Sequence, residues 1–268
     1  MKTRKGMALF LAILMIVTNI VTLGAGANEA PAQDNAAEYQ TLGTQIAPIT
    51  AAQTDVSAAD VARMRAWLSD NLLNAGTNGT APAYEISYNG TLLSDSLSSW
   101  TFTNVRNTDV SENVESYTVT AANASAGLSL RCEVLFYTDF AACEWEVFAS
   151  SSNAGDVNVV TDFYAMKSAI SMPSETASPA ATVHYNRGSM DQANAFKPFS
   201  DTVNVNSTQT FTADGGRPSY TYMPFFNFSW QNAGGAVLAI GWPAQWYFKY
   251  ARTDAQELSL EIKQETFS

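Results

Sequence analysis

"LSLRCEVLFYTDFAACEWEVFASS" (residues 128–151) is the stretch that decides the fold class. Apolar side chains occupy every second position over residues 128–136 and again over residues 141–149. Successive side chains of a β-strand point to opposite faces of the sheet, so both segments predict strands with one buried face. Residues 138–140 separate them. We therefore expect a long antiparallel hairpin.

The only two cysteines, Cys132 and Cys143, belong to this hairpin. Both fall on the buried face if the pairing keeps the alternation of each strand. Export would permit a disulfide between them, and two buried free thiols are the alternative. The choice depends on the strand register, which the turn sets. Two cysteines and the single histidine, His184, are too few for a zinc site, and no acidic cluster has calcium-loop spacing. No metal or other cofactor is expected.

The rest of the chain predicts more strands and one helix. Alternating or apolar runs bounded by turn residues predict strands at residues 84–88, 158–165, 181–185, 201–205, 209–212, 225–230, 236–240, 245–250 and 258–262. Before them, Ser57 and Asp60 have capping-box spacing, and an apolar stripe at spacings of three and four runs to Leu72. The pattern predicts a mainly β protein, a large antiparallel β-sandwich (a supersandwich) with one N-terminal α-helix lying on it.

The chain divides into three parts. Residues 1–27 have a basic start, an apolar run over residues 7–23 and the small residues Ala25-Gly26-Ala27, which are features of a secretory signal peptide. An uncleaved membrane anchor is the alternative, although the apolar run is short for a span. We expect cleavage after Ala27, an extracellular or cell-surface location, and no membrane association afterwards. Residues 28–54 are predicted to be a flexible lead-in and residues 55–268 the sandwich domain.

The chain is strongly acidic, with 25 Asp and Glu against 14 Lys and Arg and a formal net charge of −11. Such a surface repels the phosphates of nucleic acids and of anionic membranes. Nucleic acid is therefore not an expected partner.

Three groups of residues invite a catalytic interpretation. Asp139, Glu144 and Glu146 include two carboxylates that could serve as acid and base in glycoside hydrolysis. The simpler interpretation is that the two glutamates form the solvent face of an alternating strand. His184 has no G-x-S-x-G nucleophile motif to accompany it. The Gly215-Gly216 pair is better explained as a turn than as an anion cradle, because no helix follows it.

Aromatic residues are frequent in the C-terminal half, and flat rings can stack on sugars or fill a core. The set comprises Trp100, Trp145, Tyr220, Tyr222, Phe225, Phe226, Trp230, Trp242, Trp246 and Tyr250. Each ring considered alone favours the core.

Several segments, in order, resemble a known family. They are "APAYEISYNGTLLSDSLSSW" (81–100), "YTDFAACEWEVFASSSNAGD" (137–156), "TDFYAMK" (161–167), "HYNRGS" (184–189), "DGGRPSYTYMPFFNFSW" (214–230) and "GGAVLAIGWPAQW" (234–246). Together they resemble the N-terminal β-sandwich region of bacterial α-galactosidases of the melibiase type, in glycoside hydrolase family 36. The resemblance covers roughly residues 55–262, and its most telling parts are "GGRPS…PFFNF" and "AIGWPAQW".

The resemblance implies a sandwich that packs against a (β/α)₈ catalytic barrel. In that family two barrel aspartates act as nucleophile and as acid/base. Those aspartates would lie beyond Ser268, and the chain would stop within the last strands of the sandwich. No catalytic residue is therefore assigned, and whether the chain is an enzyme is left open.

The same resemblance names residues for a sugar-binding rim or a domain interface. They are Arg217, Ser219, Trp242, Gln245 and Trp246. The alternative is that the two tryptophans only cap the core.

Our leading prediction is a secreted, non-catalytic accessory sandwich of an α-galactosidase-type glycoside hydrolase, acting in carbohydrate metabolism. Its expected partner is a carbohydrate or a (β/α)₈ catalytic domain. One alternative is a stand-alone, lectin-like secreted protein that binds carbohydrate through exposed aromatic rings. Another is an enzyme with its own pair of opposed carboxylates on the sandwich.

Overall fold

The computed structural model describes residues 8–13, 56–108, 111–152, 160–172, 177–190, 193–230 and 234–264. For residues 8–13 it describes the backbone alone. The predicted cleavage site and the lead-in at 28–54 lie outside the described residues.

Strands dominate the described chain. They are β1 (Ala8–Ile13), β2 (Glu85–Tyr88), β3 (Thr91–Leu92), β4 (Thr101–Arg106), β5 (Val114–Asn123), β6 (Leu128–Tyr137), β7 (Ala142–Ser151), β8 (Val160–Ser171), β9 (Ala181–Arg187), β10 (Pro198–Thr202), β11 (Ser207–Thr212), β12 (Tyr222–Trp230), β13 (Gly234–Ala239), β14 (Trp246–Arg252) and β15 (Glu257–Gln264). The α-helix α2 (Ala58–Leu68) continues into a π-helical turn, η2 (Ser69–Leu73), and a short 3₁₀ segment, η3 (Ser94–Ser99), follows β3.

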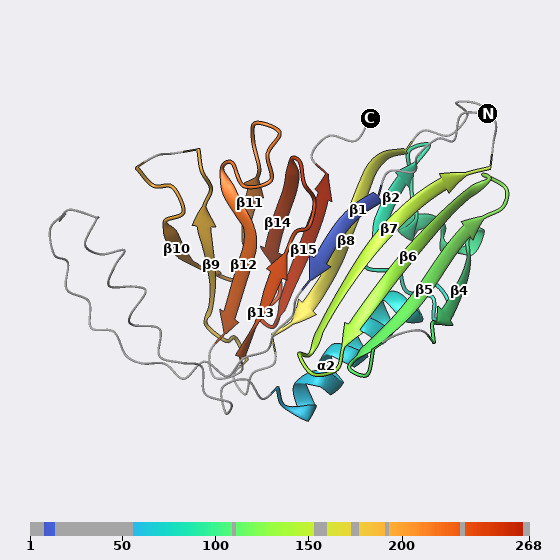
Figure 1. Cartoon of the computed structure of the whole chain (residues 1–268), viewed down its shortest axis with the longest axis horizontal. Coiled ribbons are helices and arrows are strands. Elements are labelled where there is room, and N and C mark those ends of the chain that lie inside the picture. The colour runs from blue at the N-terminus through green and yellow to red at the C-terminus, as the bar shows by residue number, and fades with distance from the viewer. Residues whose placement is uncertain are drawn as a thin grey trace, which may run out of the picture.

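These strands form three antiparallel sheets (Figure 1). Sheet A has the order β1-β7-β6-β5-β4, sheet B the order β11-β14-β15-β8-β2-β3, and sheet C the order β10-β9-β12-β13. Sheet B forms one layer, and sheets A and C lie against it. The prediction of a mainly β, antiparallel supersandwich with one N-terminal helix is confirmed.

Two kinds of contact join the layers. The Trp145 indole of sheet A donates to the carbonyl of Ala165 in sheet B over 2.8 Å. Phe226 of sheet C packs against Phe248 of sheet B, with ring centroids 4.5 Å apart. Interdigitated side chains of this kind are how the inner faces of two sheets make a single core.

The hairpin at residues 128–151 forms as predicted. β6 and β7 pair along their whole length, with Val134 opposite Trp145 and both buried. The turn between them closes through Ala141, whose φ of 48° lies in the left-handed region.

The two cysteines are both buried, as predicted, but they are free. Cys132 pairs with Val147, and Cys143 pairs with Phe136. The two cysteines therefore lie four residues apart along the hairpin, about 13 Å at the rise of a β-strand. A disulfide needs Cα atoms within about 7 Å, so this register excludes the bridge. Burial raises the pKa of both thiols, which makes them poorly reactive.

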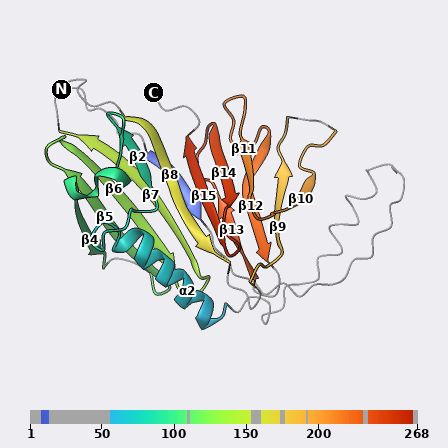
Figure 2. The ribbon, with the colours of Figure 1, turned by 180° about the vertical axis from the view of Figure 1, so that it is seen from behind.

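The helix begins where the sequence predicts. The Ser57 hydroxyl accepts from the Asp60 backbone N–H over 3.1 Å and donates to the Asp60 carboxylate over 2.7 Å. Met64, Leu68 and Leu72 are buried. Figure 2 shows α2 lying across the face of β5–β7, on the sandwich and not inside it. None of the helices in the described ranges is long and apolar enough to cross a membrane.

Besides β1 and the two-residue β3, the strands β4 and β5 were not predicted from the sequence. β4 is an edge strand with a mostly exposed surface, so it carries no apolar alternation. β5 does alternate, but its inward positions include Ala121 and Asn123. The predicted strand at 201–205 is displaced: β10 ends at Thr202, and the buried Val203 comes after it.

Part of the predicted leader forms a strand in this structure, β1. The backbone of β1 pairs with β7, with Leu11 opposite Trp145, and β1 also approaches β13 and β8. It therefore lies between sheet A and sheet C, beside β7 in Figure 1.

Candidate functional site

Trp246, one of the predicted rim residues, is a core residue. Its exposed fraction is 0%, and its indole N–H donates to the Pro218 carbonyl over 2.7 Å. Its ring meets Phe226 edge-to-face, at 5.8 Å and 85°. The Ala213 N–H donates to the Trp246 carbonyl. Trp246 holds the turn after β11 against β14, so its ring is not a platform for a sugar.

The other four predicted rim residues are more exposed than Trp246. Trp242 is buried, with 9% of its surface exposed. Arg217 is exposed, and its guanidinium lies 5.7 Å from the centroid of the Tyr220 ring. Ser219 and Gln245 are half-buried. Arg217 and Ser219 flank the proline that receives the Trp246 hydrogen bond, so the loop and β14 meet here, and binding of sugar by these residues stays a prediction.

An acidic groove occupies the outer face of β5–β7. Its volume is about 410 Å³, and its polar lining comprises Asn107, Ser116, Thr118, Glu133, Glu144 and Glu146. Glu144 and Glu146 alternate with buried residues along β7, which confirms their prediction as the outward face. Glu133, opposite Glu146 on β6, completes the group and was missed, because strand register cannot be read from one strand alone. Asp139 lies exposed on the turn and does not line the groove.

The carboxylates of this groove have distinct surroundings. Glu144 accepts from the Tyr137 hydroxyl over 2.7 Å, and this bond raises the pKa of Tyr137 to about 12. Desolvation and, secondarily, the charge of Glu144 raise the pKa of Glu146. Glu133 forms an ion pair with Arg131.

This arrangement differs from that of a glycosidase. Hydrolysis of a glycoside uses two carboxylates on opposite sides of the scissile bond, with the sugar between them. Here the carboxylates project from the same face of two paired strands and line one wall. Within the described ranges, no group of three or more His, Cys, Asp and Glu residues is arranged to hold a metal ion.

His184 lies between two serines. Its Nδ1 is 2.7 Å from the Ser200 hydroxyl and its Nε2 is 3.2 Å from the Ser229 hydroxyl, on the strands that flank β9. Both ring nitrogens are thus occupied by hydroxyls, whereas a catalytic triad needs a carboxylate at one of them. His184 fits a structural role in sheet C.

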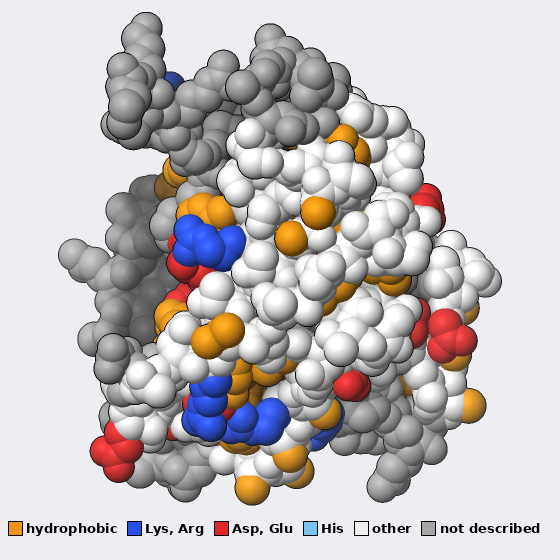
Figure 3. Space-filling view, turned by 90° about the vertical axis from the view of Figure 1, so that its right-hand side faces the viewer, with side chains coloured by type: hydrophobic (Ala, Val, Ile, Leu, Met, Phe, Trp, Pro, Cys, Tyr) orange, Lys and Arg blue, Asp and Glu red, His pale blue; other side chains and the backbone are white. Residues whose placement is uncertain are grey.

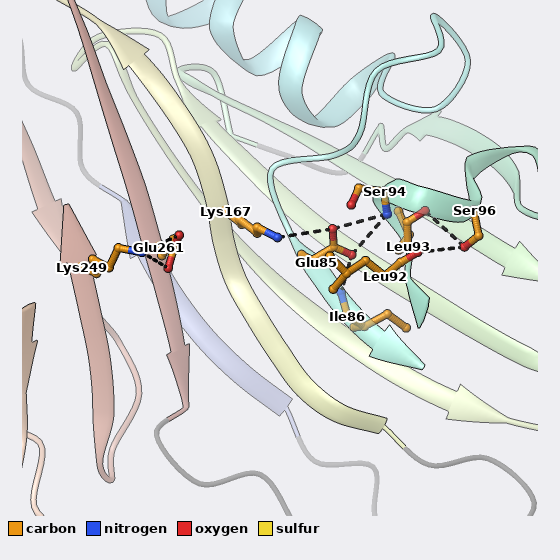
Figure 4. Close-up of polar contacts among 9 residues, drawn as sticks. All are labelled: Glu85, Ile86, Leu92, Leu93, Ser94, Ser96, Lys167, Lys249 and Glu261. Atoms are coloured by element: carbon orange, nitrogen blue, oxygen red, sulfur yellow. Dashed lines mark hydrogen bonds and ion pairs between the residues drawn. The ribbon is translucent and has the colours of Figure 1, made fainter. Parts of the chain in front are cut away.

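Sheet B carries a row of alternating charges that sequence reasoning missed (Figure 4). Lys249 on β14 bonds Glu261 on β15 over 3.0 Å, and Lys167 on β8 lies 4.0 Å from Glu85 on β2. Glu85 is 3% exposed, and it accepts from the backbone N–H of its neighbour Ile86 over 3.0 Å. It also faces the Ser94 N–H at the start of η3 over 3.4 Å. Through this contact Glu85 links the start of η3 to sheet B.

A second ion-pair group links the helix to sheet A. Arg65 on α2 makes two hydrogen bonds to the Glu115 carboxylate on β5, at 2.6 and 3.1 Å. The Tyr117 hydroxyl donates to the same carboxylate over 2.7 Å, and Arg106 lies 3.4 Å away. On the β4 side of the molecule, charged side chains gather in small separate groups among uncharged polar atoms (Figure 3). This side presents no broad field of one sign.

A pocket of about 310 Å³ lies between α2, β8 and the β12–β13 hairpin. It is lined by Arg63, Met64, Trp67, Asp70, Asn71, Ala169, Ile170, Ser171, Trp230, Gly235 and Ala236. Sequence reasoning missed it, because four separate segments supply the lining and no local pattern joins them. We call it the helix pocket.

Comparison with known proteins finds likeness in solved structures alone. No protein-family profile matches the chain, and no curated protein matches it. The α-galactosidase AgaA of Geobacillus stearothermophilus, of glycoside hydrolase family 36, solved in complex with stachyose, is 13% identical, with a TM-score of 0.46. AgaB of the same organism is 12% identical with a TM-score of 0.46, and the galactosidase domain of the α-galactosidase–sucrose kinase AgaSK is 9% identical with a TM-score of 0.49.

Each of these matches covers 68% of this chain and 26% of the other. The chain therefore spans about a quarter of the length of the structures it matches. AgaA and AgaB belong to the family that the sequence segments resemble.

Proposed function

We propose that this chain is an exported, non-catalytic β-sandwich that works with the (β/α)₈ catalytic domain of an α-galactosidase-type glycoside hydrolase. The observation that carries the proposal is the junction between the two most family-like segments. The Trp246 indole of "AIGWPAQW" bonds the Pro218 carbonyl of "GGRPS", and Ile240 N–H bonds the Pro224 carbonyl over 2.9 Å. The residues that carry the resemblance are thus residues that hold this end of the sandwich together.

The acidic groove supports a non-catalytic role. Its three glutamates come from two paired strands and line one wall. A glycosidase of either stereochemistry needs a carboxylate on each side of the sugar. On this proposal the chemistry belongs to the partner domain.

The aromatic residues favour the accessory role over a stand-alone lectin. Lectin-like binding would use exposed, coplanar rings. All six tryptophans of the chain lie in the described ranges, and each is buried or half-buried. Trp100, Trp145 and Trp246 donate their indole N–H groups within the protein. Their contribution is to the core.

The size of the native protein tests the proposal. An antibody raised against this chain is used to blot culture medium and cells of the source organism, and the species detected is then measured by intact mass spectrometry. A secreted species much heavier than 28.9 kDa is expected, and it should cleave α-galactosides. A species slightly below 28.9 kDa that co-purifies with no glycosidase would overturn the proposal.

A further inference from the structure

We propose that copies of this chain dock head-to-tail, with a cationic edge of one copy seated on the acidic groove of the next. The cationic edge lies at the end of sheet C, where β9 ends and β10 begins. It comprises Arg187, Lys197 and Arg217 with the exposed Met190 and Phe196. Because two different surfaces meet, the contact is heterologous. The proposed function uses neither surface, so the inference goes beyond it.

The three cations of the edge differ from every other Lys and Arg in the described ranges. Seven of the others form ion pairs with carboxylates. The eighth, Arg252, is buried and donates to backbone carbonyls. Arg187, Lys197 and Arg217 form no ion pair with a described residue. In a chain with a net charge of −11, the edge therefore carries positive charge that the described residues do not neutralise.

Backbone contacts join the two segments that form this edge. The Ser189 N–H donates to the Ser219 carbonyl over 3.0 Å, and the Met190 N–H donates to the Tyr220 carbonyl over 2.9 Å. A Cβ at Gly188 would lie 2.2 Å from the Ser219 carbonyl oxygen, so only glycine permits this approach. The loop after β9 and the turn after β11 therefore form one continuous surface.

Ring contacts and strand pairing hold the cations in place. The Arg187 guanidinium lies 4.7 Å from the centroid of the Tyr222 ring, and that of Arg217 lies 5.7 Å from the centroid of the Tyr220 ring. The Arg187 N–H donates to the Lys197 carbonyl over 3.0 Å. Residues opposite each other in an antiparallel pair point to the same face, so these two side chains are neighbours. A guanidinium held over a ring is already ordered for a carboxylate.

Phe196 adds an apolar knob beside these cations. Its side chain is 57% exposed, and its φ of 61° lies in the left-handed region, which is unfavourable for a bulky residue. Two hydrogen bonds hold this conformation: the Phe196 N–H donates to the Gly188 carbonyl over 3.3 Å, and the Asn186 amide donates to the Phe196 carbonyl over 3.0 Å. Met190, on the same loop, is 44% exposed. A strained backbone that holds an aromatic ring in water is a feature of contact sites.

The acidic groove has the complementary chemistry. Its three glutamates face one paired cation, Arg131, and the half-buried Leu135 opposite Glu144 adds an apolar side chain to the lining. Desolvation and then the charge of Glu144 raise the pKa of Glu146, and a guanidinium in the groove would relieve that repulsion. A groove of about 410 Å³ can admit an aromatic ring. Sheet A and β10 lie on opposite sides of the molecule, so one copy cannot join its own two surfaces (Figure 1).

The composition of the edge favours a protein as its occupant. Phe, Tyr, Met and Arg are the residue types enriched in the contact surfaces of proteins. A nucleic acid or an anionic membrane would extend past this small edge onto an acidic surface. The net charges of two copies also repel, but at 0.15 M salt the Debye length is about 8 Å, so the charges at the contact dominate. A small contact of this kind is weak, and we expect a Kd of roughly 10–100 µM.

Sedimentation velocity of the full chain tests the proposal, from about 5 to about 500 µM at 0.15 M salt, a range that brackets the expected Kd. We expect reversible association that grows with concentration and does not stop at a dimer, because each added copy leaves one edge and one groove free. A chain that stays monomeric over this range would overturn the proposal. Binding of poly-L-glutamate by such a monomer would assign the edge to a different acidic partner.

Two charge reversals locate the surfaces by complementation. Arg217→Glu places a like charge against the groove, and Glu146→Arg places one against the edge, so each alone should weaken association at least tenfold. A mixture of the two variants should associate again, because the intact edge of the Glu146→Arg chain meets the intact groove of the Arg217→Glu chain. A mixture that stays monomeric would contradict head-to-tail docking, as would a variant that associates as the parent chain does.

A matched pair of milder variants controls for net charge and for folding. Arg217→Gln and Arg63→Gln each remove one positive charge from an exposed arginine, and Arg63 belongs to neither surface. Both should leave the melting temperature nearly unchanged, since Arg63 loses only an exposed ion pair. Only Arg217→Gln should weaken association, by about three- to tenfold. Equal effects of the two variants would show that net charge, and not the cationic edge, governs association, and would overturn the proposal.

Discussion

At the scale of single residues, Trp246 decides between two uses of an aromatic ring. Its sequence context, between a proline and an aromatic strand, fits both a surface platform and a core residue. The alternation of β14 resolves the matter in the structure: Trp246, Phe248 and Tyr250 all face the core. Sequence alone could not fix this, because the strand begins at Trp246 itself and its phase depends on where the preceding turn ends.

Trp246→Ala should lower the free energy of unfolding by about 3–5 kcal/mol, because it leaves a cavity where a fully buried indole was. Thermal and urea unfolding measure this loss. Trp246→Phe is the control, since it retains most of the ring and loses the bond to Pro218. A melting temperature unchanged in Trp246→Ala would mean that the ring is not part of the core.

Glu115 gives a prediction that depends on pH. The hydrogen bonds from Arg65 are the main cause of its lowered pKa. A carboxylate with a lowered folded-state pKa stabilises the protein above its unfolded pKa of about 4.3, and this contribution is lost as the pH falls through the folded-state value. Glu115→Gln should therefore cost about 1 kcal/mol at pH 7, as expected for a partly exposed pair.

The measurement is urea unfolding of both proteins between pH 7 and pH 3. The difference between them should shrink towards the acid end. A difference that stays constant across this range would show that the charge of Glu115 contributes nothing and that the loss is one of packing.

At the scale of elements, the predictable parts are those whose own sequence carries the pattern. In the hairpin at 128–151, buried and outward-facing residues alternate in both strands, and α2 has a cap and an apolar stripe. The local sequence is therefore enough to predict each of these elements. β4 could not be predicted, because an exposed edge strand has no buried face to reveal it. The helix pocket could not be predicted either: Trp67 and Trp230 meet only through tertiary packing.

Ser57→Ala tests the start of the helix. Ser57 both accepts from the Asp60 N–H and donates to its carboxylate, so its loss should cost about 1 kcal/mol. Denaturant unfolding monitored by circular dichroism gives the value. Ser57→Thr serves as the matched control, since threonine keeps a hydroxyl that can cap the helix. Equal effects of both changes would show that the cap is not the cause.

The two free thiols make the hairpin testable as an element. Cys132 and Cys143 are fully buried and have raised pKa values, so a thiol reagent such as Ellman's should label neither in the native protein. Both should react at once in denaturant without a reductant. If denatured protein yields no thiol until it is reduced, the two cysteines are bridged and the register of β6 and β7 is wrong.

At the scale of the whole molecule, sheet B is continuous, whereas the opposing layer is built from two separate sheets. β1 lies at their boundary, paired with β7 and close to β13. If the predicted leader is removed, the outer edge of β7 loses the strand that covers it. An uncovered edge exposes backbone N–H and C=O groups to other strands.

Hydrogen exchange can follow this change. A chain that begins at Asn28 should exchange the β7 amides that face β1 faster than the chain of 268 residues does. The amides of β6, which is paired on both sides by β5 and β7, should be protected equally in the two proteins. Equal protection of β7 in both would mean that β1 does not cover this edge in solution.

The continuity of sheet B also sets how the molecule can deform. Within the described residues no strand pairing joins the two sheets opposite it, because β1 pairs with β7 and only approaches β13. The two halves of the molecule are therefore joined mainly through sheet B, near β8 and β15. The β8–β15 pairing changes register between Ile262 and Lys263, and such an irregularity is where a sheet bends most readily. Any opening of the sandwich would therefore bend sheet B near β8 and β15. The helix pocket, which is lined by α2 and β8 and by β12 and β13 of sheet C, would widen or narrow with this motion.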